Sequence, residues 1–272
     1  MTDPRAAAHA AAHGQQAHAV RLEWGPTGGA AVAAGADLAV VVDVLSFTTT
    51  LTVAVERGMA VHPFAWRDER AAQHAAALDA VLAVGRLEQP SAGVAAVSLS
   101  PAAMSRVEGV ERIVLPSPNG STISAALAAS GATVVGASLR NRAAVARWLA
   151  PRVADGAVLA VVPAGERWPD DSLRPAVEDL WGAGAVLAAL DALGATGQAV
   201  TGVGAEAAFA RDAFRAVQAT LTQSVADCAS GRELSVAGFA DDVAMAAELD
   251  VSDVVPVLGA DGAFRDAGHR RP

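Results

Sequence analysis

The segment from Leu38 to Thr50, LAVVVDVLSFTTT, constrains the fold of this chain more than any other. Its apolar and largely β-branched first part is long enough for a fully buried strand. In an open α/β sheet the carboxyl end of a strand faces the ligand crevice, and the next helix offers free N–H groups to an anion. A carboxylate follows the apolar run, so Asp43 is a candidate ligand for a cation. The hydroxyls after it are candidate phosphate ligands: Ser46, Thr48, Thr49 and Thr50.

The same residues also have an ordinary structural interpretation. Asp43 can accept hydrogen bonds from nearby backbone N–H groups, and Ser46 or Thr48 can cap a helix. The local sequence leaves both interpretations open, so the rest of the chain has to decide between them.

Strand and helix signals alternate along the chain, which predicts one α/β domain with a mostly parallel or mixed sheet. Strands are expected at 19–24, 38–45, 60–63, 81–84, 112–115, 133–136, 158–162 and 254–258. Helices are expected at 49–57, 69–80, 100–107, 122–129, 141–149, 176–193, 206–229 and 238–249. Gly25 to Gly35 is interpreted as a glycine-rich hairpin or loop. We expect the domain to span residues 20–264, preceded by a disordered leader at 1–19 and followed by a flexible tail at 265–272.

Composition narrows the classes of function. The chain has 272 residues, of which 53% are hydrophobic, so it can bury a large core. No apolar run approaches the roughly 18 residues of a membrane span, and the first residues lack the pattern of a signal peptide, so we expect a cytoplasmic protein with no membrane partner. The single cysteine, Cys228, fits a reducing compartment. A net charge of -9 argues against a nucleic-acid partner.

The absence of two residue types is more informative. All 20 basic residues are arginine and there is no lysine, which excludes a P-loop lysine and a Schiff-base lysine. Tyrosine is absent too, and only His62 and His74 lie outside the leader and the tail. Any catalytic chemistry therefore has to come from carboxylates, amides, hydroxyls, arginine and a hard metal ion.

Three further strand-to-helix junctions carry polar residues in a similar position. One has Asn119, Gly120 and Ser121, the next has Arg140 and Asn141, and the third has Glu178 and Asp179 at the expected start of a helix. Each junction alone fits an ordinary turn, surface charge or helix-dipole contact. Their recurrence at four junctions favours one shared site that these loops line.

The ordered series DVLSFTTT, LSP, PNGST, RNRAAVA, PAG, ED and ADDV resembles the 2-phosphosulfolactate phosphatase (ComB-like) family. The resemblance covers about Arg21 to Val257. The positions that match the family's motifs are Asp43, Val44, Leu45, Thr48, Thr49, Ser100, Pro101, Asn119, Gly120, Ser121, Asn141, Gly165, Glu178 and Asp179. The resemblance implies a layered α/β/α fold, magnesium, a small phosphorylated substrate and a homodimer.

Two positions depart from the family pattern. Ser46 stands where the family usually has arginine, and Pro163 stands where it usually has cysteine. The first change removes an anion-binding group, so we expect either a substrate with fewer negative charges or recruitment of another arginine: Arg86, Arg140 or Arg167. The second change leaves no thiol at that point.

The function expected from these residues is Mg²⁺-dependent hydrolysis of a phosphate monoester on a small anionic metabolite. Asp43, together with Glu178 or Asp179, is expected to hold Mg²⁺ and to be catalytic. Substrate is expected to contact Ser46, Thr48, Thr49, Asn119, Gly120, Ser121, Arg140, Asn141 and Gly165. The alternative is a catalytically altered family member that binds a small phosphorylated or anionic ligand. The Gly202 to Ala207 segment only mimics a dinucleotide fingerprint, because a very short apolar stretch precedes it.

Overall fold

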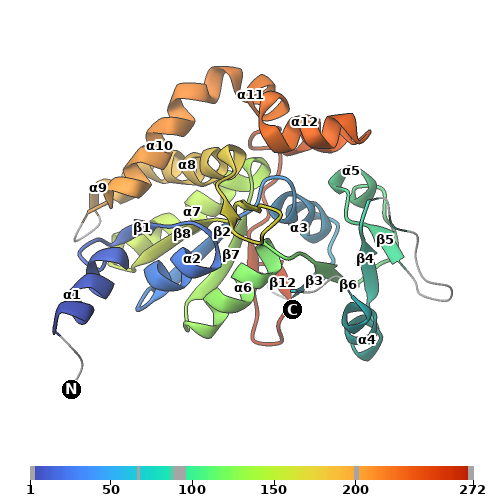
Figure 1. Cartoon of the computed structure of the whole chain (residues 1–272), viewed down its shortest axis with the longest axis horizontal. Coiled ribbons are helices and arrows are strands. Elements are labelled where there is room, and N and C mark those ends of the chain that lie inside the picture. Colours follow the sequence, from blue (N-terminus) through green and yellow to red (C-terminus); the bar gives the residue numbers. More distant parts are fainter. Residues whose placement is uncertain (1–3, 66–67, 87, 89–95, 199–201, 269–272) are drawn as a thin grey trace.

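A mixed ten-stranded sheet forms the centre of the computed structural model, which describes residues 4–65, 68–86, 88, 96–198 and 202–268 (Figure 1). The strand order is β1-β8-β2-β7-β11-β12-β3-β6-β4-β5. The strands are β1 Val20–Leu22, β2 Leu38–Val42, β3 Ala60–Phe64, β4 Val81–Val84, β5 Ala96–Ser98, β6 Arg112–Pro116, β7 Thr133–Ala137, β8 Leu159–Pro163, β11 Pro256–Leu258 and β12 Phe264–Asp266. A separate two-stranded hairpin consists of β9 Glu166–Arg167 and β10 Leu173–Arg174.

Strand β2 lies between β7 and β8, parallel to both, and all five of its residues are buried. Its side chains alternate between two cores: Leu38, Val40 and Val42 belong to one cluster, and Ala39 and Val41 to the other. A strand covered on both faces needs a continuous apolar run, which explains why LAVVV contains no polar residue.

The helices form a layer on each face of the sheet, which confirms the layered α/β/α fold (Figure 1). The helices that cover the sheet face of Val40 are α7 Arg142–Ala154, α8 Val177–Ala192, α10 Ala205–Val217, α11 Leu221–Asp227 and α13 Ala240–Ala246. The opposite layer contains α2 Gly25–Ala33, α3 Phe47–Glu56, α5 Pro101–Met104 and α6 Gly120–Ala129. The remaining helices are α1 Pro4–His13, α4 Glu69–Ala77, α9 Ala195–Gln198 and α12 Ala229–Val236.

The two strands at the C-terminal end of the sequence join two parallel half-sheets. Strand β11 pairs antiparallel with β7 through Val257 and Val135, and β12 pairs antiparallel with β3 through Phe264 and Val61. Strands β11 and β12 also pair with each other. The sheet is therefore parallel on both sides of an antiparallel centre.

Helix α2 replaces the hairpin or loop that the sequence predicted for Gly25 to Gly35. Gly28 and Gly29 serve packing instead of a turn. A Cβ atom on Gly29 would lie 2.9 Å from Val162 of β8, and one on Gly28 would lie 2.9 Å from the Glu23 side chain. The prediction was wrong because close approach of a helix to a sheet and a tight turn both select glycine.

The leader and the tail also differ from the expectation where the structure describes them. Helix α1 occupies Pro4–His13, and the Gln15 side chain that follows is buried. At the other end, Arg265 and Asp266 belong to β12. Residues 1–3 of the leader and 269–272 of the tail lie outside the described residues.

The long helix predicted for 206–229 is divided into α10, α11 and α12. A 3-10 turn, Gln218–Thr220, separates α10 from α11, and Cys228 has an extended backbone between α11 and α12. These breaks change the direction of the chain, so that Ser230 and Glu233 of α12 reach the cavity described below.

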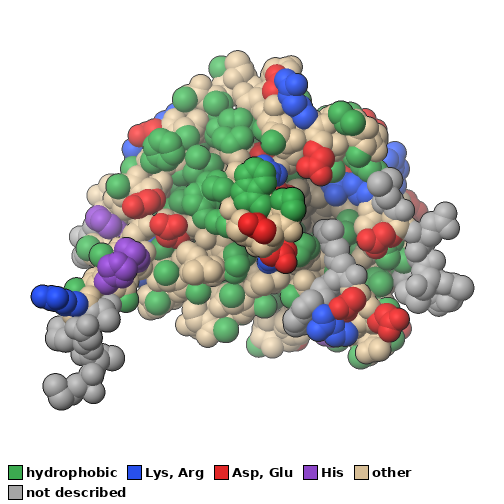
Figure 2. Space-filling view, viewed as in Figure 1, with side chains coloured by type: hydrophobic (Ala, Val, Ile, Leu, Met, Phe, Trp, Pro, Cys, Tyr) green, Lys and Arg blue, Asp and Glu red, His purple; other side chains and the backbone are tan. Residues whose placement is uncertain are grey.

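Hydrophobic side chains gather on one face of the molecule, over the β9–β10 hairpin and the neighbouring helices (Figure 2). They include Trp168 and Leu173 of the hairpin region and Val177 at the start of α8. None of the helices in the described part of the chain has the length and apolar character needed to cross a lipid bilayer.

Candidate active site

A cavity of about 330 Å³ opens at the carboxyl ends of strands from both half-sheets, the parallel pair β2 and β8 and the parallel pair β4 and β6. It receives Asp43 after β2, Arg86 after β4, Asn119 after β6 and Glu166 after β8. This is the place where an open α/β sheet binds its ligands. The polar side chains that line it are Asp43, Ser46, Thr50, Arg86, Ser117, Asn119, Glu166, Arg167, Arg174, Ser230 and Glu233.

The Asp43 side chain is buried where helices α3 and α6 begin. Its Oδ1 atom accepts a hydrogen bond from the Phe47 backbone N–H at 3.0 Å, and its Oδ2 atom accepts one from Gly120 at 3.2 Å. One carboxylate thus receives N–H groups from two helix starts, where the helix dipoles favour negative charge. Gly120 binds Asp43 in this arrangement, not an external phosphate.

The hydroxyls of α3 and α6 contact backbone carbonyls of their own neighbourhood. Thr48 donates to the Asp43 carbonyl at 2.8 Å, Thr49 to the Val44 carbonyl at 2.7 Å, and Ser121 to the Leu115 carbonyl at 2.9 Å. None of these three side chains lines the cavity. The structure therefore gives these hydroxyls the ordinary structural role that the sequence had left open. Of the hydroxyls that follow Asp43, Ser46 and Thr50 lie on the cavity wall, and Thr50 donates to the Leu99 carbonyl at 2.9 Å.

Asp179 in the first turn of α8 ties two strand ends together. Its carboxylate accepts a hydrogen bond from Val44 at 2.7 Å and another from the Gly165 backbone N–H at 2.9 Å. Burial and the negative charges of Asp43 and Glu178 raise the pKa of Asp179 well above its ordinary value. The structure thus brings Asp179 and Gly165 beside Asp43, behind the cavity wall.

Glu166 is a cavity residue that sequence reasoning missed, because it lies between the strand expected at 158–162 and the helix expected at 176–193, where no element was predicted. Burial raises the pKa of Glu166 to about 7, and the negative charges of Asp43 and Glu178 act in the same direction. Asn119 donates its amide to Glu166 Oε2 at 2.9 Å, which opposes the shift. A carboxyl group with a pKa near neutrality, facing a cavity, is suited to proton transfer.

Glu178 is buried beside Cys228, behind the cavity wall. Burial, the negative charge of Glu178 and a hydrogen bond with it raise the pKa of Cys228 to about 12. The thiol therefore stays protonated and serves as a neutral neighbour of the Glu178 carboxylate.

Three arginines give the cavity positive charge. Arg86 donates to Ser46, Arg167 donates to the Asn119 side-chain oxygen at 3.3 Å, and Arg174 donates to Ser230 at 3.0 Å. Arginine presents several N–H donors in a planar fork that matches phosphate and carboxylate oxygens. The cavity therefore has donors for an anion as well as carboxylates that can bind a cation.

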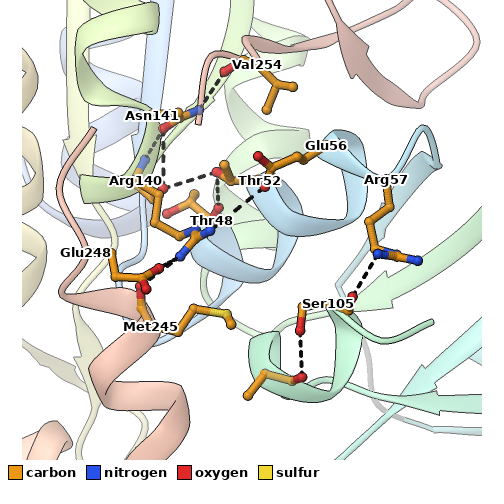
Figure 3. Close-up of polar contacts among 12 residues, drawn as sticks. Thr48, Thr52, Glu56, Arg57, Ser105, Arg140, Asn141, Met245, Glu248 and Val254 are labelled. Atoms are coloured by element: carbon orange, nitrogen blue, oxygen red, sulfur yellow. Dashed lines mark hydrogen bonds and ion pairs between the residues drawn. The ribbon is translucent and has the colours of Figure 1, made fainter. Parts of the chain in front are cut away.

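Arg140 and Asn141 are not among the residues that line the cavity. Figure 3 shows their contacts with Glu248 and Val254 instead. Arg140 is buried and forms ion pairs with Glu248 and Glu56. The Asn141 side chain accepts from the Ser138 backbone N–H at 2.8 Å and donates to the Val254 carbonyl at 3.1 Å. These contacts fix the turn after β7 against the C-terminal segment, so neither side chain reaches the cavity.

The carboxylates near the cavity fit a weakly coordinated divalent cation. Asp43 and Glu178 raise the pKa of both Glu166 and Asp179, which shows negative charge concentrated in one buried region. Within the described residues, no three or more His, Cys, Asp or Glu side chains are grouped so that they could enclose a metal ion by themselves. Mg²⁺ keeps several water ligands and binds proteins through one or two carboxylates, so it suits this donor set.

Comparison with known sequences agrees with this geometry. A family profile described as 2-phosphosulpholactate phosphatase matches residues 30–261. That range contains all four strand ends that form the cavity. No curated protein sequence matches the chain.

Proposed function

We propose that this chain, which belongs to the 2-phosphosulfolactate phosphatase family, hydrolyses a phosphate monoester on a small anionic metabolite with the help of Mg²⁺. One observation carries the proposal: a single cavity is lined both by carboxylates, Asp43 and Glu166, and by three arginines, Arg86, Arg167 and Arg174. A phosphate monoester bound to Mg²⁺ needs both kinds of group, because the metal requires oxygen ligands and the phosphoryl oxygens require positive charge.

The arginines would bind and orient the substrate. Arg167 is held by Asn119 and by the Pro118 carbonyl, and Arg174 is held by Ser230. These contacts aim guanidinium groups at the cavity before a substrate arrives, which lowers the entropy lost on binding. Arg167 and Arg174 would then neutralise charge on the phosphoryl oxygens.

Asp43 and Glu178 would hold Mg²⁺. The negative charges of these two residues raise the pKa of both Glu166 and Asp179, so all four carboxyl groups belong to one acidic region. When bound, the metal would polarise the phosphoryl oxygens and lower the pKa of a coordinated water. Asp179 would keep the loops after β2 and β8 in register through Val44 and Gly165. Glu166 would accept a proton from the attacking water at its carboxylate and return it to the leaving oxygen.

Phosphate release from phenyl phosphate and from 2-phosphosulfolactate, measured with Mg²⁺ and with chelator, tests this function. We expect release with Mg²⁺ only, and a fall in kcat/KM of about a hundredfold or more in Asp43→Asn, since a lost metal ligand removes charge stabilisation from the transition state. Asp37→Asn is the matched control, because Asp37 lies just before the other end of β2, is exposed, and its carboxylate accepts from the Val158 backbone N–H away from the cavity.

Full activity in chelator, or an unimpaired Asp43→Asn variant, would contradict the proposal. A protein that releases no phosphate but is stabilised against heat by phosphorylated acids would support the alternative, a catalytically altered family member that binds such ligands.

A further inference from the structure

Arg86 is held at the cavity wall by groups from two other parts of the chain, the loop after β2 and the start of α13. Its Nε atom donates to Asp242 Oδ2 at 2.6 Å, and its Nη2 atom donates to Ser46 Oγ at 2.6 Å. The guanidinium also lies over the ring of Phe239, 5.6 Å from its centroid. Two hydrogen bonds and a stacked ring together leave the guanidinium one orientation.

The partner of Arg86 is itself fixed in the protein interior. The Asp242 side chain is only 2% exposed and lies in the first turn of α13. The Ser100 hydroxyl and the Ala102 backbone N–H donate to its Oδ1 atom. Burying an ion pair costs desolvation free energy unless both partners are fully hydrogen bonded. Both oxygens of Asp242 are paired in this network, which holds the Arg86 guanidinium beside the cavity.

The arginine still has capacity to bind a ligand. Arg86 lines the cavity, its side chain is 16% exposed, and Nη1 has no hydrogen-bond partner among the described residues. Ser46, which accepts from Arg86, is three residues from Asp43 in the chain. The Arg86 guanidinium is thus fixed at the loop that carries Asp43, although Arg86 itself belongs to another part of the chain.

We propose that Arg86 is a specificity-determining residue whose guanidinium binds a second anionic group of the substrate, a carboxylate or sulfonate next to the phosphate ester. This inference rests on the proposed phosphatase function. Ser46 then acts as a positioning residue, because its hydroxyl accepts from Nη2 and its small side chain leaves room for the guanidinium. Asp242 is the second positioning residue. An arginine at position 46 would remove that acceptor and place a like charge against Arg86.

The test compares two phosphate esters, 2-phosphoglycolate, which carries a carboxylate, and phenyl phosphate, which does not. The readout is the ratio of kcat/KM for 2-phosphoglycolate to that for phenyl phosphate. In Arg86→Gln we expect this ratio to fall by about tenfold to a hundredfold, the effect of losing one charged hydrogen bond. The loss should appear in KM more than in kcat. Arg106→Gln, an exposed arginine outside the cavity, should leave both rates unchanged.

Further variants separate charge from geometry. Arg86→Lys keeps the positive charge but loses the planar set of guanidinium N–H donors. The substrate ratio should therefore lie between those of Arg86→Gln and the wild type. Ser46→Ala keeps the Asp242 ion pair and removes only the acceptor for Nη2, so it tests positioning even if Arg86→Gln fails to fold. We expect it to lower the same ratio by a smaller factor.

Binding provides a readout that does not depend on turnover. Wild-type Tm should rise with 2-phosphoglycolate, and Arg86→Gln should lose most of that rise. An unchanged substrate ratio and an unchanged Tm rise in both Arg86→Gln and Ser46→Ala would overturn the assignment of Arg86. Absence of hydrolysis of either ester by the wild type would contradict the proposed function instead, and the Tm measurement would still decide the role of Arg86.

Discussion

Glu166 is an acid on the cavity wall whose ionisation depends strongly on its surroundings. Its pKa of about 7 lies above the ordinary 4.5 because it is buried near Asp43 and Glu178. In the metal-free protein, the folded state keeps the proton between these two pH values while the unfolded chain releases it. The free energy of unfolding therefore falls as pH rises from about 4.5 to about 7.

We expect this linkage to be visible in thermal unfolding with chelator present. Wild-type Tm should fall between pH 5 and pH 8, and Glu166→Gln should show a smaller fall because glutamine does not titrate. Glu111→Gln, at an exposed position before β6, is the control and should follow the wild-type curve. Identical curves for wild type and Glu166→Gln would show that the Glu166 carboxyl is not held in this environment.

Single residues differ in how far the sequence could predict their roles. Asp43, Ser46 and Asn119 were predicted as site residues and line the cavity, because the end of a buried strand can be recognised locally. Thr48 and Thr49 could not be assigned correctly, because a hydroxyl in the first turn of a helix can bind a backbone carbonyl just before it as readily as a ligand.

Arg140 and Asn141 were predicted as substrate-binding residues but do not line the cavity, for a different reason. Their partners Glu248 and Val254 lie 108 and 113 residues further along the chain. Nothing near Arg140 in the sequence indicates an ion pair that forms only when the C-terminal segment folds back.

At the level of elements, the packing of α3 against α6 holds Asp43 in place. Gly120, the first residue of α6, lies against Phe47, the first residue of α3. A Cβ atom on Gly120 would lie 2.2 Å from the Phe47 ring. Because Phe47 and Gly120 both donate to the Asp43 carboxylate, this close approach of two helix starts also sets the position of the carboxylate.

Gly120→Ala should therefore destabilise the protein and lower activity together. We expect a loss of about 1–3 kcal/mol in the free energy of unfolding, the usual cost of overpacking. Denaturant titration measures the loss, and kcat/KM with phenyl phosphate measures the displacement of Asp43. Gly197→Ala is the control, because no atom lies within 4 Å of the added Cβ in that helix. Equal stability of the two variants would contradict the described contact.

The elements themselves were largely predictable from apolar periodicity, as β2, β6, β7, β8 and α8 show. The errors fall where one residue type serves two purposes or where strands are very short. Helix α2 was missed because its glycines permit contact with β8. The three-residue strands β5 and β12 were missed because so short a stretch has no measurable period.

At the level of the whole molecule, the segment expected to be a disordered leader is bonded to the sheet. The Gln15 side chain donates to the Leu22 carbonyl at 2.7 Å and accepts from the Leu22 backbone N–H at 3.1 Å. Leu22 belongs to β1, the strand at one edge of the sheet. Gln15 thus satisfies the backbone groups that an edge strand leaves unpaired.

Gln15→Ala should leave both backbone groups of Leu22 without their partners. We expect the free energy of unfolding to fall by about 1–3 kcal/mol, measured by denaturant titration. The neighbouring Gln16 is exposed, so Gln16→Ala should change stability by less than about 0.5 kcal/mol. If the two variants are equally stable, the segment contributes nothing to the sheet.

The position of β11 and β12 in the sheet has a consequence for synthesis on the ribosome. One half-sheet supplies Asp43 and Glu166 to the cavity and the other supplies Arg86 and Asn119, yet the strands that join them are translated after all the others. Until β11 and β12 emerge, the nascent chain has two half-sheets whose inner edges, β7 and β3, lack their antiparallel neighbours. Such open edges attract other strands, so this chain is most exposed to aggregation and to chaperone capture in the last moments of translation.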